Sequence, residues 1–195
     1  MLTRRNFLHR SGALLVGSLA LPGLARTFAA PNVSGHKRVD KKQGIVTIVM
    51  KSDPSGAHVW FDPIGIYVEP GQTIRWQVMQ NVHTATAYHP KNDNHCLRIP
   101  ENALPWNSGF LVNPDEHYDV TLTVEGVYDY YCIPHEMVGM VGRIIVGHAT
   151  GPGSLPFDYY MGKPGTASWK AVPDAAKKAF PSIEQIMREK VVHFG

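Results

Sequence analysis

Three side chains that can bind a metal ion lie close together in one short stretch. Cys132, His135 and Met140 supply a thiolate, an imidazole and a thioether, and Pro134 and Gly139 favour a tight loop between them. A copper ion that cycles between Cu(I) and Cu(II) suits this mixture, because sulfur favours Cu(I), imidazole binds both states and the thioether gives a long, weak axial bond. Such a site needs a second imidazole from another part of the chain.

His83 is the candidate for that second imidazole. It follows directly on the β-rich run 73–78, so a strand of the same fold would deliver it to the loop. Met137 offers another thioether, but its spacing suits the axial position less well than that of Met140. The sequence therefore predicts four ligands for one copper ion: His83, Cys132, His135 and Met140.

Other interpretations of these residues remain open. Cys96 and Cys132 permit one disulfide in an oxidising compartment, which would remove the thiolate from the metal site. The polar segment that carries His89, His95 and Cys96 is a candidate for a second copper site, although histidines in polar loops are usually solvated. Zinc is a further alternative, but methionine is a poor reason to choose it.

The sequence lacks the motifs of several enzyme classes. It contains no H-x-H or H-C-H pair of the kind found in multicopper oxidases, and no G-x-S-x-G or H-E-x-x-H motif of a hydrolase. Cys96 and Cys132 are also too far apart for the C-x3-C pattern of a binuclear copper centre. We therefore expect a protein that transforms no substrate.

The elements that must position these ligands are strands. Residues 44–148 contain short β-rich runs separated by turns rich in Pro, Gly, Asn and Asp, which is typical of an all-β sandwich. Pro70 and Gly71 predict a tight turn, since Pro presets φ for the corner and Gly accepts the positive φ that follows. The predicted strands are 45–50, 64–68, 73–78, 118–124, 127–131 and 141–146.

The C-terminal residues 149–195 form a tail with two predicted short helices. Pro173 and Asp174 suit the first turn of one helix, and Ser182 with Gln185 forms a possible capping box for the next. The apolar stripe of the second helix is expected to pack on the sandwich rather than on a partner; its members are Ile183, Ile186, Met187 and Val191.

The first 43 residues are predicted to form a signal peptide followed by a linker. Arg4 and Arg5 precede the apolar run 13–24, which is too short to span a bilayer, so residues 1–30 resemble a twin-arginine signal peptide for export to the periplasm. Residues 31–43 are polar and basic and are predicted to be a linker. We expect no stable membrane insertion.

The charge balance argues against nucleic acid as a partner. The whole chain has 19 Lys and Arg against 16 Asp and Glu, but four of the arginines lie in residues 1–30, which hold no acidic residue. The remaining chain is close to neutral, so it lacks the basic surface that binding to nucleic acid requires.

The ligand loop resembles that of a known family. The C-x-P-H-x4-M pattern after a strand ending in Tyr130 and Tyr131 is similar to the copper loop of plastocyanins, pseudoazurins and related cupredoxins, and the Pro-Gly turn with its Trp-bearing strand at 68–76 is similar too. The resemblance covers residues 44–148. It implies a Greek-key β-sandwich with one type 1 copper, bound by the nitrogens of His83 and His135, the thiolate of Cys132 and the thioether of Met140.

The resemblance also implies a function and leaves an alternative. Cupredoxins of this kind carry single electrons between redox partners, here a cytochrome or a copper enzyme. The alternative is a periplasmic copper-tolerance protein that binds or oxidises surplus copper, for which His89, His95 and Cys96 are the motivating residues. The chain departs from plastocyanins at Thr84, where they usually place an asparagine that ties the two ligand loops together.

Overall fold

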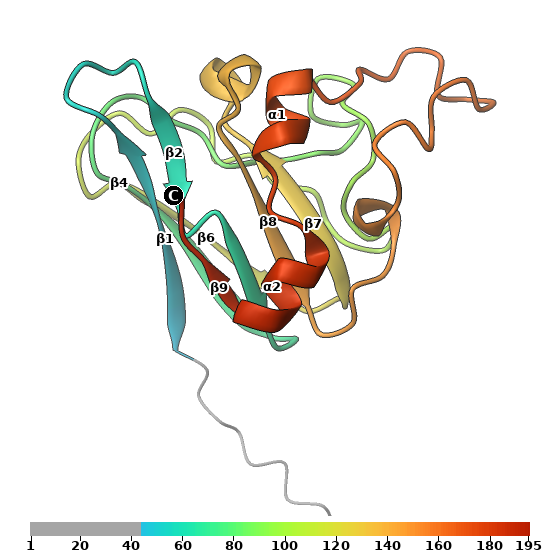
Figure 1. The fold of residues 1–195 in the computed structure, drawn as a ribbon, viewed down its shortest axis with the longest axis horizontal. Coiled ribbons are helices and arrows are strands. Elements are labelled where there is room, and N and C mark those ends of the chain that lie inside the picture. The colour runs from blue at the N-terminus through green and yellow to red at the C-terminus, as the bar shows by residue number, and fades with distance from the viewer. Residues whose placement is uncertain (1–43) are drawn as a thin grey trace, which may run out of the picture. The chain divides into compact units, whose positions relative to one another are not determined.

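The computed structural model describes residues 44–195, which form two packed β-sheets (Figure 1). The first sheet has the strand order β2-β1-β4-β6. Its strands are β1 (Ile45–Ser52), β2 (Val59–Asp62), β4 (Gln72–Val78) and β6 (His117–Leu122). The pair β1 and β4 is parallel, and the other two pairs are antiparallel.

The second sheet carries the ligand loop and has the order β5-β7-β8-β3-β9. The loop connects its antiparallel strands β7 and β8, and β3 pairs with β8 in parallel. The strands are β3 (Gly65–Val68), β5 (Thr86–Ala87), β7 (Gly126–Tyr131), β8 (Val141–Val146) and β9 (Val191–Val192). This two-sheet arrangement confirms the prediction of an all-β sandwich.

Strand β4 shows how the sequence pattern builds the core. Ile74, Trp76 and Val78 are buried and alternate with partly exposed residues, as expected for a strand with one face on the core. Every residue of β7 and β8 is buried, because the C-terminal tail and the loop 88–98 add a second cover to this sheet. The ligand loop therefore connects two strands of the sandwich that are buried along their whole length.

The predicted Pro-Gly turn is present before β4. Gly71 has a φ of 93°, a backbone conformation that residues with a Cβ rarely adopt. Its amide donates to the Leu122 carbonyl at 2.7 Å, which joins the turn to β6. Leu122 is buried as predicted, whereas Val120 is only partly buried and Val124 lies beyond the end of the strand.

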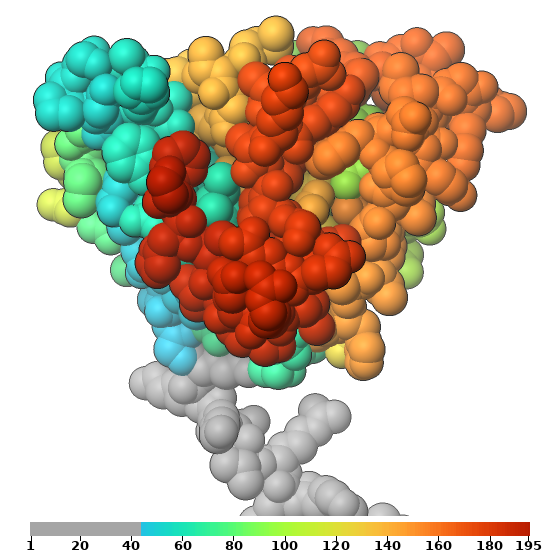
Figure 2. Space-filling view, in the orientation of Figure 1, coloured from blue at the N-terminus to red at the C-terminus, as the bar shows by residue number. Residues whose placement is uncertain are grey.

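The C-terminal tail contains two short helices and a strand. Helix α1 spans Asp174–Ala179 and α2 spans Ile183–Glu189, with Ser182 accepting a hydrogen bond from the Gln185 amide as its cap. Helix α2 packs on β3, β8 and β9, and the tail covers much of the face shown in Figure 2. The prediction that Val191 belongs to the apolar face of this helix is wrong, because Val191 lies in β9, which pairs with β3.

Two sequence predictions fall outside the described residues. The signal peptide at 1–30 and the linker at 31–43 both precede residue 44, where the description begins. Among residues 44–195, no helix combines the length and the apolar character that a membrane crossing requires.

Candidate metal centre

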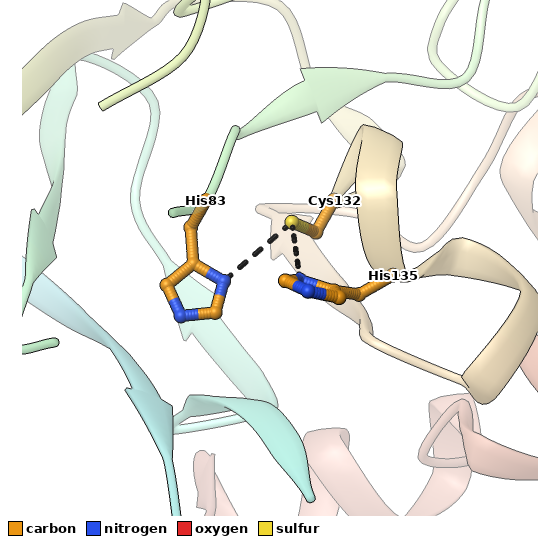
Figure 3. A group of neighbouring side chains, drawn as sticks. All are labelled: His83, Cys132 and His135. Atoms are coloured by element: carbon orange, nitrogen blue, oxygen red, sulfur yellow. Dashed lines mark hydrogen bonds between the residues drawn. The ribbon is translucent and has the colours of Figure 1, made fainter. Parts of the chain in front are cut away.

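Three of the four predicted ligands meet at the end of β7. Nδ1 of His83 lies 3.6 Å from Sγ of Cys132, and Nδ1 of His135 lies 3.4 Å from the same atom. Figure 3 shows both imidazole rings turned toward the sulfur. The ligand atoms of these residues all lie within 4.8 Å of one another, so a single ion could contact all three.

The loop between β7 and β8 is a single short 3-10 helix, η1 (Ile133–Val138). Cys132 stands immediately before it, Pro134 lies in its first turn, and Gly139 ends it with φ of 92°. The Cys132 amide donates to the Met140 carbonyl at 3.0 Å, which closes the loop at its base. Proline and glycine thus place the thiol and the imidazole on one side of a turn that has little freedom.

Thr84 ties the two ligand segments together. Its hydroxyl accepts a hydrogen bond from the Ile133 amide at 2.8 Å, and its own amide donates to Sγ of Cys132 at 3.3 Å. Thr84 is fully buried and its hydroxyl also shares a hydrogen bond with Thr86. Thr84 therefore connects the two ligand loops at the position where plastocyanins usually have an asparagine.

Burial keeps all three groups neutral in the protein without metal. It raises the pKa of the Cys132 thiol to about 12, against a smaller opposing effect of hydrogen bonds from Thr84 and His135. Burial also lowers the pKa of His83 to about 4, with a further contribution from the nearby His135, and it lowers the pKa of His135. A bound cation reverses this preference for the thiol and favours the thiolate.

The two methionines of the loop have opposite environments. Met140 is fully buried next to the base of the loop, whereas Met137 is 73% exposed. A thioether that joins the buried group at Cys132 has to be buried itself, and of the two methionines only Met140 is. Two imidazoles, one thiol and a buried thioether form the soft, nitrogen-and-sulfur donor set that copper prefers, so the residues fit this metal.

The structure removes two alternative interpretations of the cysteines and histidines. Cys96 and Cys132 are both free, so no disulfide competes for the thiolate. Across residues 44–195, side chains of His, Cys, Asp and Glu gather in groups of three or more around a possible metal position at one place, the His83 group. His89, His95 and Cys96 do not come together as a second site.

His95 instead belongs to a buried network that the sequence did not reveal. Its Nε2 lies 3.0 Å from Oε2 of Glu136, and its Nδ1 lies 2.9 Å from the Asn92 carbonyl oxygen. Tyr88 donates its hydroxyl to Oε1 of Glu136 at 2.6 Å. Burial alone would lower the pKa of His95, but the hydrogen bond and charge of Glu136, helped by Asn92, raise it overall.

The comparisons with known proteins agree with this geometry. Residues 46–147 match the family model of copper binding proteins of the plastocyanin/azurin family. This match covers more than half of the chain, which therefore belongs to that family, whose cofactor is one copper ion.

Individual relatives support the same assignment. A chloroplastic plastocyanin of Hordeum vulgare is 33% identical over an alignment of 102 positions, which covers 47% of this chain and 57% of that protein. A pseudoazurin of Paracoccus pantotrophus is 30% identical over 102 residues, or 52% of this chain and 61% of that protein. The aligned part of the chain thus spans less than two thirds of these relatives.

A solved structure shows the same fold over a larger share of the chain. The pseudoazurin from Sinorhizobium meliloti superimposes with a TM-score of 0.51 and 25% sequence identity, and the match covers 74% of this chain and 94% of that one. The cupredoxin fold expected from the sequence is thereby confirmed.

Proposed function

We propose that this protein carries single electrons by cycling one bound copper ion between Cu(I) and Cu(II), and that it transforms no substrate. The observation that carries the proposal is the buried group of two imidazoles and one thiol at the end of β7, with one of its rings reaching the surface. Proteins of the cupredoxin family are typically single-electron carriers, which agrees with this donor set.

The proposed ligands are His83, Cys132, His135 and Met140. When bound, copper would supply a one-electron couple at this position. The protein's own contribution is to hold the ligands in nearly the same place in both oxidation states. Thr84 joins the two ligand segments, and the backbone hydrogen bond between Cys132 and Met140 closes the loop. The ligands therefore need to move little when the copper changes oxidation state.

The surface around His135 suits brief contact with another redox protein. His135 is partly exposed and lies in a turn whose apolar residues face outward: Ile133 is 43% exposed, Met137 73% and Val138 65%. Phe110 is also exposed, on the segment that pairs with His83 through Leu111. An apolar surface beside a redox group permits close approach without strong binding, which an electron carrier needs in order to release its partner.

The cellular setting extends the proposal. The arginine pair and apolar run of residues 1–30 support export by a twin-arginine route to the periplasm, where a cytochrome or a copper enzyme would be the redox partner. The alternative role in copper tolerance loses its motivating feature, because His95 is engaged with Glu136 instead of joining His89 and Cys96.

Electron self-exchange of the copper-loaded protein tests this function. A lysine at position 138 would bring like charges together when two molecules meet at the His135 surface, so Val138→Lys should slow self-exchange on the order of tenfold, with most of the loss recovered at high salt. The rate is measured by NMR line broadening in mixtures of reduced and oxidised protein.

Leu104→Lys is the matched control. Leu104 is 86% exposed, and it lines a surface depression with Val124, which precedes β7, whereas Cys132 follows the other end of that strand. We expect this variant to exchange electrons at the wild-type rate. Equal slowing in both variants would contradict electron exchange through the His135 surface, and the lack of a reversible one-electron couple in the wild type would contradict the proposed function itself.

A further inference from the structure

Glu136 is an unusual residue for its position in η1. The neighbouring apolar residues Met137 and Val138 point to solvent, yet the carboxylate beside them is 8% exposed. A carboxylate is costly to bury unless it is paired and hydrogen-bonded, and exposed positions were available within the same turn. Its burial therefore calls for a structural explanation.

Both carboxylate oxygens of Glu136 are engaged. Oε1 accepts the Tyr88 hydroxyl at 2.6 Å, and Oε2 lies 3.0 Å from Nε2 of His95. Both partners are buried. The other ring nitrogen of His95 faces the Asn92 carbonyl and also lies 3.1 Å from the Tyr131 hydroxyl, so the ring is fixed from both sides.

The partners of Glu136 are themselves fixed to the sandwich. The Tyr88 amide donates to the Asp129 carbonyl of β7, and the Tyr88 carbonyl accepts from the Arg98 amide. The segment beyond His95 is joined to the tail, because the Cys96 amide donates to the Lys170 carbonyl. Glu136 thus connects the exposed ligand turn to a rigid support behind it.

The orientation of His135 is set mainly by the turn that carries it. Within residues 44–195 its ring makes one hydrogen bond, to Sγ of Cys132. Its position is otherwise set by η1, where the Gly139 amide donates to the Glu136 carbonyl and the Met140 amide donates to the His135 carbonyl. Helix α1 packs against the end of this turn near Gly139. Thr84 fixes the start of the turn through Ile133, and Glu136 fixes its middle.

We propose that Glu136, held by Tyr88 and His95, is a positioning residue for His135: it anchors the ligand turn from inside so that the imidazole stays in place when the copper changes oxidation state. This inference rests on the proposed function and adds to it a chain-specific device that fixes the exposed ligand. It assigns no contact between Glu136 and the metal.

Amide hydrogen exchange in the copper-free full chain tests the anchor without the metal. In Glu136→Ala, the Gly139 and Met140 amides should exchange at least about tenfold faster, because the turn loses its internal support, while the amides of β4 stay at the wild-type rate. Met137→Ala is the matched control, since it truncates the adjacent, exposed side chain, and it should change these rates less than about twofold.

Two further variants separate geometry from charge and from general damage. Glu136→Gln can still accept from Tyr88 and can donate to a neutral His95, so it should restore most of the protection. Tyr88→Phe removes one hydroxyl and leaves the carboxylate, and it should give a smaller effect in the same direction. This milder variant keeps the test valid if Glu136→Ala does not fold.

The copper-loaded proteins supply the second readout. Glu136→Ala should change the Cu(II) hyperfine splitting in the EPR spectrum, whereas Glu136→Gln and Met137→Ala should keep the wild-type splitting. Glu136→Ala should also slow self-exchange on the order of tenfold relative to Glu136→Gln, which leaves the surface around His135 unchanged. The proposal is overturned if Glu136→Ala matches Met137→Ala in both the amide exchange rates and the EPR spectrum. It is also overturned if exchange rises equally in β4, or if exchange rises in the turn while the EPR spectrum stays unchanged.

These outcomes are distinguishable from failure of the proposed function. A wild-type protein without a thiolate-to-copper band would end the electron-carrier proposal, and the copper-free exchange data would still decide whether Glu136 anchors the turn. A normal wild-type band with no difference between the Glu136 and Met137 variants would end the anchor alone.

Discussion

Two buried polar clusters are centred three residues apart in the sequence, on Asp129 within β7 and on Cys132 just after it, and they are built in opposite ways. Asp129 of β7 is fully buried between two guanidinium groups, with Nε of Arg98 2.7 Å from Oδ2 and Nε of Arg143 2.7 Å from Oδ1. Nη2 of Arg143 also donates to Oδ2 of Asp129, and the other guanidinium nitrogens donate to tail carbonyls, including those of Gly153 and Pro181. Every charge in this cluster has a partner.

The cluster at Cys132 lacks such compensation. Sγ of Cys132 has two long contacts to imidazole nitrogens, and it accepts one hydrogen bond from the backbone amide of Thr84. The pKa of the thiol is raised and that of His83 is lowered, both chiefly by burial, so the charged forms are disfavoured. A cluster of hydrogen-bonded ion pairs stabilises the fold. A cluster of buried, neutral metal-binding groups is instead suited to bind a cation, which would stabilise the thiolate form of the cysteine.

The largest expected effect on stability comes from breaking the paired cluster. Asp129→Asn leaves two buried guanidinium groups without a counter-charge, so the free energy of unfolding should fall by about 3–5 kcal/mol. Urea denaturation of the copper-free protein measures this loss.

The exposed pair on the other sheet provides the control. Arg75 and Asp119 form two hydrogen bonds of 2.8 and 2.7 Å across β4 and β6, but both side chains are partly solvated. Asp119→Asn should cost less than about 1 kcal/mol. If the two variants lost the same stability, the buried cluster would not have the structural role that its pairing indicates.

The next effect is a pH dependence that belongs to the metal cluster. The pKa of His83 falls from 6.5 to about 4 on folding, so between these values the unfolded chain binds more protons than the folded one. The free energy of unfolding of the copper-free protein should therefore decrease as the pH falls from 6.5 to 4, by about 3 kcal/mol for this residue. His135 contributes in the same direction.

Urea denaturation of the wild type and of His83→Gln across this pH range measures the contribution. Above pH 6.5 the difference in stability between the two proteins should be constant, and below it the wild type should lose stability faster. Parallel curves down to pH 4 would show that His83 is not held neutral in the folded protein.

Within the two buried clusters, the smallest expected effect on stability comes from removing the sulfur of Cys132. The Cys132 thiol is neutral and weakly hydrogen-bonded in the copper-free protein, so Cys132→Ala should lower the free energy of unfolding by only about 1 kcal/mol, mainly through a small cavity. A loss as large as that of Asp129→Asn, measured by the same urea titration, would mean that Cys132 is part of the structural cluster.

The sequence predicted the parts of the fold that local chemistry determines. Alternation and turn residues located all six expected strands, including β4 with its Pro-Gly turn, and Ser182 located the start of α2. The strands β2, β5 and β9 were missed; β5 and β9 have only two residues each, too few to show an alternating pattern. Val191 was placed on a helix because nothing local indicates that it pairs with Ile66 of β3.

For the site, the sequence predicted the metal-binding residues but not the contacts that support them. Spacing and residue type identified His83, Cys132 and His135, which the fold brings together across 49 residues of sequence. The supporting contacts were not predictable, since Tyr88 and Glu136 are 48 residues apart and neither carries a motif. In the sequence His95 suggested a second metal site, but three-dimensional packing pairs it with Glu136.

Electron transfer by this protein requires that the cluster around Cys132 bind copper through its thiolate. The most direct test is the visible absorption spectrum of the wild type and of Cys132→Ala, each with one equivalent of Cu(II), with EPR spectra of the same samples. We expect an intense thiolate-to-copper band in the wild type that is absent from the variant. A pale spectrum that the substitution leaves unchanged would show that Cys132 is not a ligand and would contradict the account.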